Sequence, residues 1–212
     1  MLHRLIEKLS DYPRFFLFCR RLLEDNFKVI RKTIQEHLVS SRDQTVLDIA
    51  CGPGAFSNLF TPEKYTGGDI NPKYIDFAKK NYHGRFSVQD ARTLQFPDRS
   101  FDHVLVYGLL HHLSDQDAIK VLSGVQRVLK SGGKALIIED IPTESNLNLL
   151  GHLLHSAENG HFIRPANDYH KLLEPFFRFE DEKLFRSGIC DYYMARVIVK
   201  PTDPEIQNCK NQ

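Results

Sequence analysis

The sequence has 212 residues, of which 42% are hydrophobic and 26% are charged, and its formal net charge at pH 7 is +1. This length and composition are typical of one globular domain with a substantial core. The nearly balanced charge argues against a nucleic-acid partner, because no overall positive field would attract phosphates.

The cysteines and the N-terminus indicate the cellular setting. The cysteines have neither disulfide nor metal spacing, which favours a reducing, cytoplasmic location; they are Cys19, Cys51, Cys190 and Cys209. The opening residues include Arg4, Glu7 and Lys8, which are too many charges for a signal-peptide core. No apolar run approaches the roughly 20 residues that cross a bilayer, so we expect no stable membrane insertion.

Residues 1–40 have the apolar spacing of helices. A short first helix has one apolar face, formed by Leu2, Leu5, Ile6 and Leu9. A second, continuous helix is predicted to start near Pro13, with apolar positions at Phe15, Cys19, Leu22, Leu23, Phe27, Ile30, Ile34 and Leu38. This region could pack on the edge of a sheet, or it could be a lid that excludes water through Tyr12, Phe15 and Phe16.

A glycine-containing turn follows the first predicted strand, at residues 46–49. The turn is Gly52-Pro53-Gly54, and the apolar positions of residues 55–60 predict a helix after it. A strand, a glycine turn and a helix bring backbone N–H groups close to a nucleotide-like ligand. Taken alone, the turn is equally consistent with a plain strand–helix connection.

Three aspartates stand at the ends of successive predicted strands, at equal intervals along the chain. They are Asp48, Asp69 as the last residue of the strand at 64–69, and Asp90 at the end of the strand that starts at Phe86. Each one alone could be a turn former or a helix cap. Together they would share the carboxyl edge of an α/β sheet, where ligands bind, and Asp69 has nearly the spacing of a ribose-binding carboxylate.

Predicted strands and helices alternate from residue 45 to residue 140, which indicates a parallel sheet with helices on both faces. Asn71 is the expected cap of a helix that begins at Pro72. Ser114 is the expected cap of a helix that reaches residue 129. The remaining segments predict strands at 102–106 and 134–140.

The alternation stops at residues 141–165, a leucine-rich segment expected to overhang the ligand edge because it follows the end of a strand. A helix at 165–175 is then followed by two strands, 176–186 and 191–200. Ser187-Gly188 would join these strands as a hairpin. Residues 201–212 are polar, and we expect them to be flexible.

Five segments in this order resemble the class I S-adenosylmethionine-dependent methyltransferases, in particular the small single-domain members that act on small molecules or lipids. The segments are 46–57, 67–72, 90–91, 101–106 together with 111–113, and 128–133. The resemblance extends from about residue 45 to residue 140 and, more loosely, to residue 200. Ala50 departs from it, because many members have the first glycine of Gly-x-Gly-x-Gly at this position.

The resemblance implies an α/β fold, a three-layer Rossmann-like sandwich. Its sheet would have seven mostly parallel strands with an antiparallel C-terminal strand, and helices would be added at the N-terminus. Residues 1–200 would form one domain with a helical lid or cap at 1–40, a cofactor-binding core at 45–140 and a substrate-side insertion at 141–165. Residues 201–212 would be a tail.

The resemblance also implies S-adenosylmethionine as the cofactor. The residues that it assigns to the amino-acid end of the cofactor are Asp48, Ala50, Cys51, Gly52 and Gly54. Those that it assigns to the adenosyl part are Asp69, Ile70, Asp90 and Ala91. Tyr107 and Gly108 would lie beneath the sulfonium.

His111 and His112 are the candidates for catalysis, because an imidazole titrates near neutral pH. His111 could be a general base, and it could equally be a core histidine whose nitrogens have partners. A second cluster, formed by His152, His155, Glu158 and His161, lacks a recognised metal-ligand pattern, so we expect no metal site. Arg164 could bind an acidic substrate group or form a surface ion pair.

The function that these patterns favour is methyl transfer to a small-molecule or lipid-like acceptor. An NAD-dependent oxidoreductase is the rival enzyme class, but its fingerprint has a third glycine where this chain has Ser57. A methyltransferase-like module that binds ligands without turnover is the third alternative. The sequence predicts neither the acceptor atom nor the oligomeric state.

Overall fold

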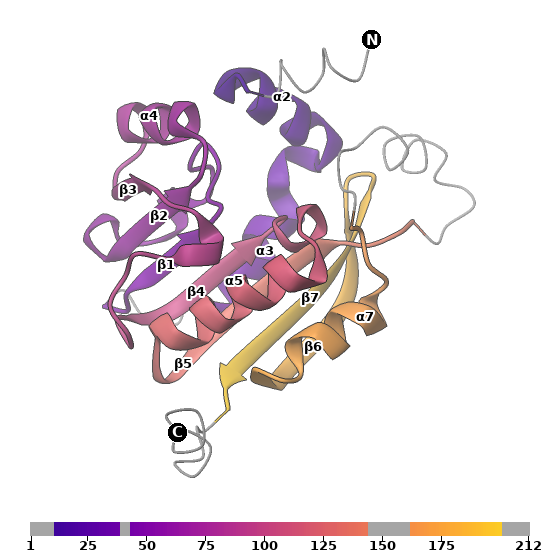
Figure 1. The fold of residues 1–212 in the computed structure, drawn as a ribbon. Coiled ribbons are helices and arrows are strands. Elements are labelled where there is room, and N and C mark those ends of the chain that lie inside the picture. The colour runs from indigo at the N-terminus through magenta and orange to yellow at the C-terminus, as the bar shows by residue number, and fades with distance from the viewer. Residues whose placement is uncertain (1–10, 39–42, 144–161, 201–212) are drawn as a thin grey trace.

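The structure is a computed structural model that describes residues 11–38, 43–143 and 162–200 (Figure 1). Its seven described strands form one sheet in the order β3-β2-β1-β4-β5-β7-β6. Their bounds are β1 Val46–Ile49, β2 Tyr65–Asp69, β3 Arg85–Val88, β4 Phe101–Tyr107, β5 Leu129–Asp140, β6 Phe177–Ser187 and β7 Cys190–Val199.

The first five strands are parallel, and β7 is antiparallel to both β5 and β6. The predicted sheet and its antiparallel C-terminal strand are therefore confirmed. The β6–β7 hairpin also turns at Gly188 as predicted, with a positive φ of 60°. Because β1 to β5 run in one direction, the residues that follow them meet at one edge, which we call the carboxyl edge.

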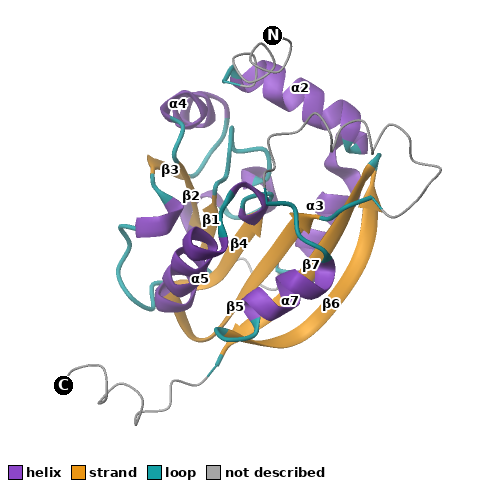
Figure 2. Ribbon diagram, turned by 45° about the vertical axis from the view of Figure 1, so that its right-hand side comes forward, coloured by secondary structure: helices purple, strands orange, loops and turns teal. Residues whose placement is uncertain are grey.

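Helices cover both faces of this sheet, which gives the three predicted layers. The helices are α2 Pro13–Leu23, α3 Lys28–His37, α4 Pro72–Asn81, α5 Asp115–Val128 and α7 Ala166–Leu173. Figure 2 shows α5 and α7 together on one face. Alternation along β1 builds two cores, since Leu47 and Ile49 pack with α5 and α7 while Val46 packs with α2, α3 and α4.

The two predicted helix caps are confirmed. Asn71 Oδ1 accepts the backbone N–H of Lys73 at 3.0 Å at the start of α4. Ser114 Oγ accepts the backbone N–H of Asp117 at 3.3 Å at the start of α5. Each side chain satisfies an N–H that the first helical turn leaves free, which fixes where the helix begins.

The helix predicted after the glycine turn was wrong. Residues 57–59 and 62–64 form single 3₁₀ turns in its place. Thr61 precedes Pro62 and is extended, as the proline ring requires, so a helix has no room to continue. Ser57 Oγ also donates to the carbonyl of Gly54 at 2.9 Å, a local bond that competes with helix formation.

The prediction of one continuous helix over residues 13–38 was also wrong. Asp25, Asn26 and Phe27 have φ values of 50°, 55° and 59°, and they separate α2 from α3. The β6–β7 hairpin occupies this break, because Ile189 N–H donates to the Leu23 carbonyl at 3.0 Å. Leu22, expected in the core, is consequently exposed at the end of α2.

Two further differences concern boundaries. β5 starts at Leu129 rather than at residue 134, so Gly132 and Gly133 lie inside a longer strand. The predicted first helix, most of the 141–165 insertion and the 201–212 tail lie outside the described residues.

Candidate functional site

The glycine turn, residues 50–54, leaves β1 at the carboxyl edge. Ala50, Gly52 and Gly54 have positive φ values of 58°, 54° and 86°. A Cβ on Gly54 would lie 3.1 Å from Ala78 Cβ, so this position needs glycine for space as well as for conformation. Cys51 N–H donates to the Gly68 carbonyl at 3.0 Å and ties the turn to the end of β2.

Asp69, the last residue of β2, lies directly against this turn. Its Oδ2 accepts the backbone N–H of Gly52 at 2.8 Å, and its Oδ1 accepts that of Asn71 at 2.8 Å. Burial raises the pKa of the carboxyl, and the two N–H donors oppose that shift. Each oxygen still has a lone pair that could accept a second hydrogen bond.

Asp48 lies below the turn and not on its surface. The side chain is buried, and Oδ2 accepts the phenol of Tyr65 at 2.7 Å. Burial raises the pKa of Asp48 to about 7, and the negative charge of Asp69 contributes to the shift. Asp48 and Asp69 therefore sense each other's charge, but Asp48 contacts the α3 and α4 side of the core.

The third aspartate lies apart from this pair. Asp90 accepts the backbone N–H of Arg92 at 2.9 Å and pairs with its guanidinium, which together lower the pKa of the carboxyl. It therefore caps a 3₁₀ turn, Ala91–Thr93, as an isolated aspartate often does. Ile70 directly follows Asp69 in the sequence. It is 62% exposed and is a large apolar side chain at the carboxyl edge.

Helix α2 crosses above this edge, between α4 and the tip of the β6–β7 hairpin (Figure 1). Phe16 packs on Tyr74 of α4 with ring centroids 5.3 Å apart. A Cβ on Gly52 would lie 3.9 Å from the Phe16 ring, so this ring also lies over the glycine turn. Lys73 pairs with Asp11 at 3.1 Å beside it.

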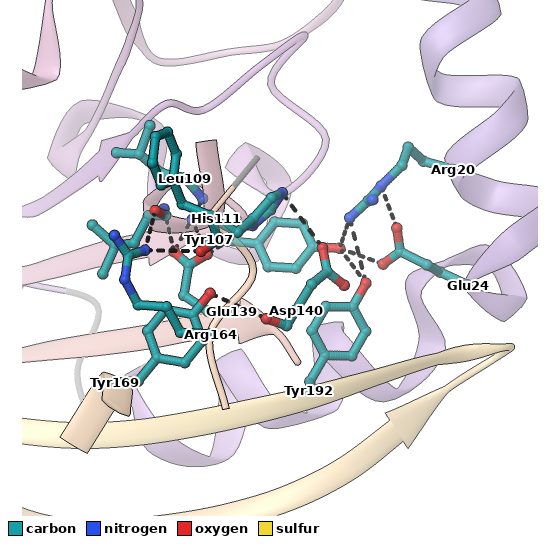
Figure 3. A network of polar contacts seen from close by, with 12 residues as sticks. Arg20, Glu24, Tyr107, Leu109, His111, Glu139, Asp140, Arg164, Tyr169 and Tyr192 are labelled. Atoms are coloured by element: carbon teal, nitrogen blue, oxygen red, sulfur yellow. Dashed lines mark hydrogen bonds and ion pairs between the residues drawn. The ribbon is translucent and has the colours of Figure 1, made fainter. Parts of the chain in front are cut away.

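The other end of α2 joins a polar cluster at the ends of β4 and β7 (Figure 3). The Tyr107 hydroxyl accepts from Arg20 Nη2 at 2.9 Å and donates to the carboxylate of Glu24. Arg20 and Glu24 form an ion pair within the helix. The hydroxyl of Tyr192 lies 3.3 Å from that of Tyr107.

Glu139, at the end of β5, holds the loop that follows β4. It accepts the backbone N–H groups of Leu109, Leu110 and His111 at 3.0, 2.8 and 3.3 Å. It also bonds to Nδ1 of His111 at 2.9 Å. Four donors on one buried carboxylate fix the backbone of this loop and the orientation of the imidazole.

His111 is therefore a buried, partnered histidine, one of the two roles open to it. Its Nε2 faces Oδ2 of Asp140 at 3.6 Å. The two carboxylates raise the pKa of His111 against the opposite effect of burial. With both nitrogens directed at carboxylates, His111 is placed to orient those groups rather than to act as a direct base.

Arg164 stabilises the same loop and lines a surface pocket together with Asp115, Phe162 and Asp168. It donates to the carbonyls of Leu110, Leu113 and Phe162 at 2.7, 2.7 and 3.0 Å. It also pairs with Asp115 at 2.7 Å. The ion pair expected for this residue is present, on a side chain that is largely buried.

Several members of the cluster were not among the predicted site residues: Arg20, Glu24, Glu139, Asp140 and Tyr192. A signal existed for two of them, since Glu139 and Asp140 are acids that end an otherwise apolar strand. The cluster of histidines and a glutamate at 152–161, for which no metal site was expected, lies outside the described residues. Within the described ranges, no group of three ligating side chains could hold a metal.

Comparison with known proteins extends these observations. Residues 46–133 match the family model described as a methyltransferase domain. A demethylmenaquinone methyltransferase from Thermotoga maritima is 35% identical over 117 residues, which cover 53% of this chain and 50% of the relative. Over this segment the chain is similar to the class I S-adenosylmethionine-dependent methyltransferases. The matched segment contains the glycine turn, all three aspartates and His111.

Another relative and a solved structure are also similar to this chain. A fatty-acid O-methyltransferase from Mycolicibacterium smegmatis is 36% identical over 104 residues, or 46% of this chain and 37% of the relative. The PH0226 protein from Pyrococcus horikoshii has the same fold, with a TM-score of 0.65 and 23% identity over 85% of this chain and 96% of its own. The chain spans about half the length of the first curated relatives it matches.

None of the helices in the described ranges combines the length and the hydropathy that a membrane span needs.

Proposed function

We propose that this chain is an enzyme that transfers a methyl group from S-adenosylmethionine to a small-molecule or lipid-like acceptor. The observation that carries the proposal is the carboxylate of Asp69, which bonds to the N–H of Gly52 beside the exposed Ile70. A carboxylate, a glycine turn and an apolar side chain suit a ribose, an amino-acid tail and an adenine, respectively.

The proposed binding roles follow from this arrangement. Asp69 would accept the two ribose hydroxyls, and Ile70 would pack on the adenine. The turn from Ala50 to Gly54, including Cys51 and Gly52, would face the amino-acid end through its backbone. Asp90 and the N–H of Ala91 would bind the adenine edge.

Two of the predicted contacts have a more indirect basis. Asp48 bonds to Tyr65 within the core, so its proposed effect on the amino-acid end acts through charge and through the shape of the turn. Tyr107 and Gly108 would lie beneath the sulfonium, next to the polar cluster.

S-adenosylmethionine supplies a methyl group on a positively charged sulfur. The work of this chain is to hold the acceptor in line with that methyl group and to keep water out. The Phe16 ring, which packs on Tyr74, supports the second task, because it covers Gly52 in the turn that would face the cofactor. Residues 11–23 are therefore proposed as part of a lid over residues 45–140, within one domain that extends to residue 200.

A lipid-like acceptor is favoured by relatives named for quinone and fatty-acid methylation. The acceptor would be bound near residues 141–165. A cytoplasmic location without nucleic-acid partners is proposed from the free cysteines and the balanced charge.

Calorimetric titration with S-adenosylmethionine and, separately, with NAD tests the cofactor. We expect saturable heat with the first compound and none with the second. Release of S-adenosylhomocysteine, measured with a panel of phenols, fatty acids and amines, tests turnover. Binding of S-adenosylmethionine without turnover of any acceptor would favour the silent binding module, and binding of NAD alone would favour the oxidoreductase.

A further inference from the structure

Asp140 has a buried carboxylate oxygen without a hydrogen bond. The residue ends β5 and is 1% exposed. Among the described residues, nothing donates to its Oδ2. The Nε2 of His111 lies 3.6 Å away, which is too long for a hydrogen bond. Because a buried carboxylate oxygen that accepts no hydrogen bond is costly, its presence points to a ligand or to a proton-transfer role.

The His111 ring is oriented with Nε2 toward Oδ2 of Asp140. A carboxylate only accepts, so Nδ1 is the donor in its 2.9 Å bond to Glu139. The other nitrogen then faces Asp140 (Figure 3). The ring lies between the two carboxylates, with Nδ1 toward Glu139 and Nε2 toward Asp140.

Asp140 and His111 lie next to the point where the transferred methyl group would lie. Gly108, with a φ of 63°, separates His111 from Arg20. A Cβ built on Gly108 would lie 3.6 Å from Cε1 of His111 and 3.9 Å from Nη2 of Arg20. The inference rests on the proposed function, which assigns Gly108 to the floor beneath the sulfonium.

The charges around this point disfavour an anionic acceptor. The charged and titratable groups that face Asp140 and His111 come from α2, β4, β5, α7, β7 and the loop after β4: Arg20, Glu24, Tyr107, His112, Glu139, Tyr169 and Tyr192. Three acidic side chains, Glu24, Glu139 and Asp140, surround this point together with two basic ones, Arg20 and His111. A further carboxylate would be repelled, whereas a hydroxyl could donate to Oδ2 of Asp140.

We propose that Asp140, with His111 and Glu139 behind it, accepts the proton of a neutral hydroxyl acceptor of the phenol class. The O–H bond breaks, its electron pair stays on the oxygen, and the proton passes to Oδ2. The oxygen forms the new bond to the methyl carbon while the sulfur keeps the electrons of the old one. Asp140 is the catalytic residue, and His111 and Glu139 are positioning residues.

The first test compares two acceptor probes of equal size, 4-octylphenol and 4-octylbenzoic acid. S-adenosylhomocysteine release is measured for the wild type, Asp140→Asn, Glu139→Gln and Asp98→Asn. Asp98, whose side chain is 73% exposed, is the matched control. We expect methylation of the phenol only, and at least a 100-fold loss of kcat in Asp140→Asn. The Kd for S-adenosylmethionine should stay within twofold in all variants, and Asp98→Asn should keep wild-type turnover.

The second test needs no acceptor. Nitrogen NMR of the histidine rings gives the titration midpoint of His111, which is assigned by the signal lost in His111→Gln. Asp140→Asn should lower that midpoint by at least one pH unit, and Asp98→Asn should leave it in place.

Two results would overturn the proposal: turnover of the benzoic acid with undiminished kcat in Asp140→Asn, or a His111 midpoint that Asp140→Asn does not change. If neither probe is methylated, the shift of the His111 titration midpoint in Asp140→Asn decides whether the proposal stands. Failure to bind S-adenosylmethionine is a different outcome, because it contradicts the proposed function itself and leaves the histidine titration readable.

Discussion

The carboxylate of Asp69 accepts the backbone N–H of Gly52 at 2.8 Å, so the end of β2 is bonded to the turn that leaves β1. A residue proposed to bind the cofactor thus also shapes the loop that would face it. Mutations of Asp69 must therefore be read with both effects in view.

Asp69→Ala should raise the Kd for S-adenosylmethionine about 100-fold or more. The variant loses two acceptors for ribose hydroxyls, and each hydrogen bond to a charged group contributes ~1.5–3 kcal/mol. Calorimetric titration gives the Kd. Asp76→Ala is the control, since Asp76 is an exposed aspartate on the neighbouring α4. An unchanged Kd in Asp69→Ala would contradict the ribose assignment.

The carboxyl edge was predictable because its signals are local. A strand pattern followed by glycine or aspartate recurs at Asp48, Asp69 and Asp90, and parallel strands bring such ends together whatever else the chain does. The pattern did not predict that Asp48 points into the core. Its side chain lies on the face of Val46, and that face is buried only once α2, α3 and α4 pack on it.

The polar cluster could not be predicted in the same way. Arg20 bonds to Tyr107, 87 residues away in the sequence, and to Tyr192, 172 residues away. No short-range sequence pattern predicts such pairings. The break between α2 and α3 is similar, because its cause is a hairpin near residue 188 that bonds to the carbonyl of Leu23.

Asp48 should make stability depend on pH. Its pKa is raised from 3.8 to about 7 in the folded state, so the folded chain binds more protons than the unfolded chain between these values. Stability contributed by this group is therefore full at acidic pH and falls as the pH rises toward 7. Asp48→Asn keeps an acceptor for Tyr65 and removes the charge.

We expect Asp48→Asn to exceed the wild type in free energy of unfolding by a few kcal/mol at pH 8, and by much less at pH 5. Urea unfolding at the two pH values measures the difference. A constant difference between the two values would show that Asp48 is not the titrating group.

Gly54→Ala should destabilise the fold by about 2–4 kcal/mol. The new Cβ would lie 3.1 Å from Ala78, 3.2 Å from Phe86 and 3.3 Å from Tyr82, at a φ of 86°. Crowding and backbone strain each cost ~1–3 kcal/mol. Gly132→Ala separates crowding from backbone strain. Gly132 has a φ of 75°, and a Cβ there meets no atom within 4 Å. Urea unfolding should give about 1 kcal/mol for this control, and equal losses would contradict the steric argument.

Phe16→Ala should speed the dissociation of S-adenosylmethionine at least tenfold with little loss of stability. The Phe16 ring lies over Gly52 and packs on Tyr74, so its removal opens the cover above the glycine turn. Phe18→Ala is the matched control, because Phe18 is on the same helix and 66% exposed. Stopped-flow displacement of S-adenosylmethionine by S-adenosylhomocysteine gives both rates. If the two variants release the cofactor equally fast, α2 only packs on the sheet edge and does not close over the site.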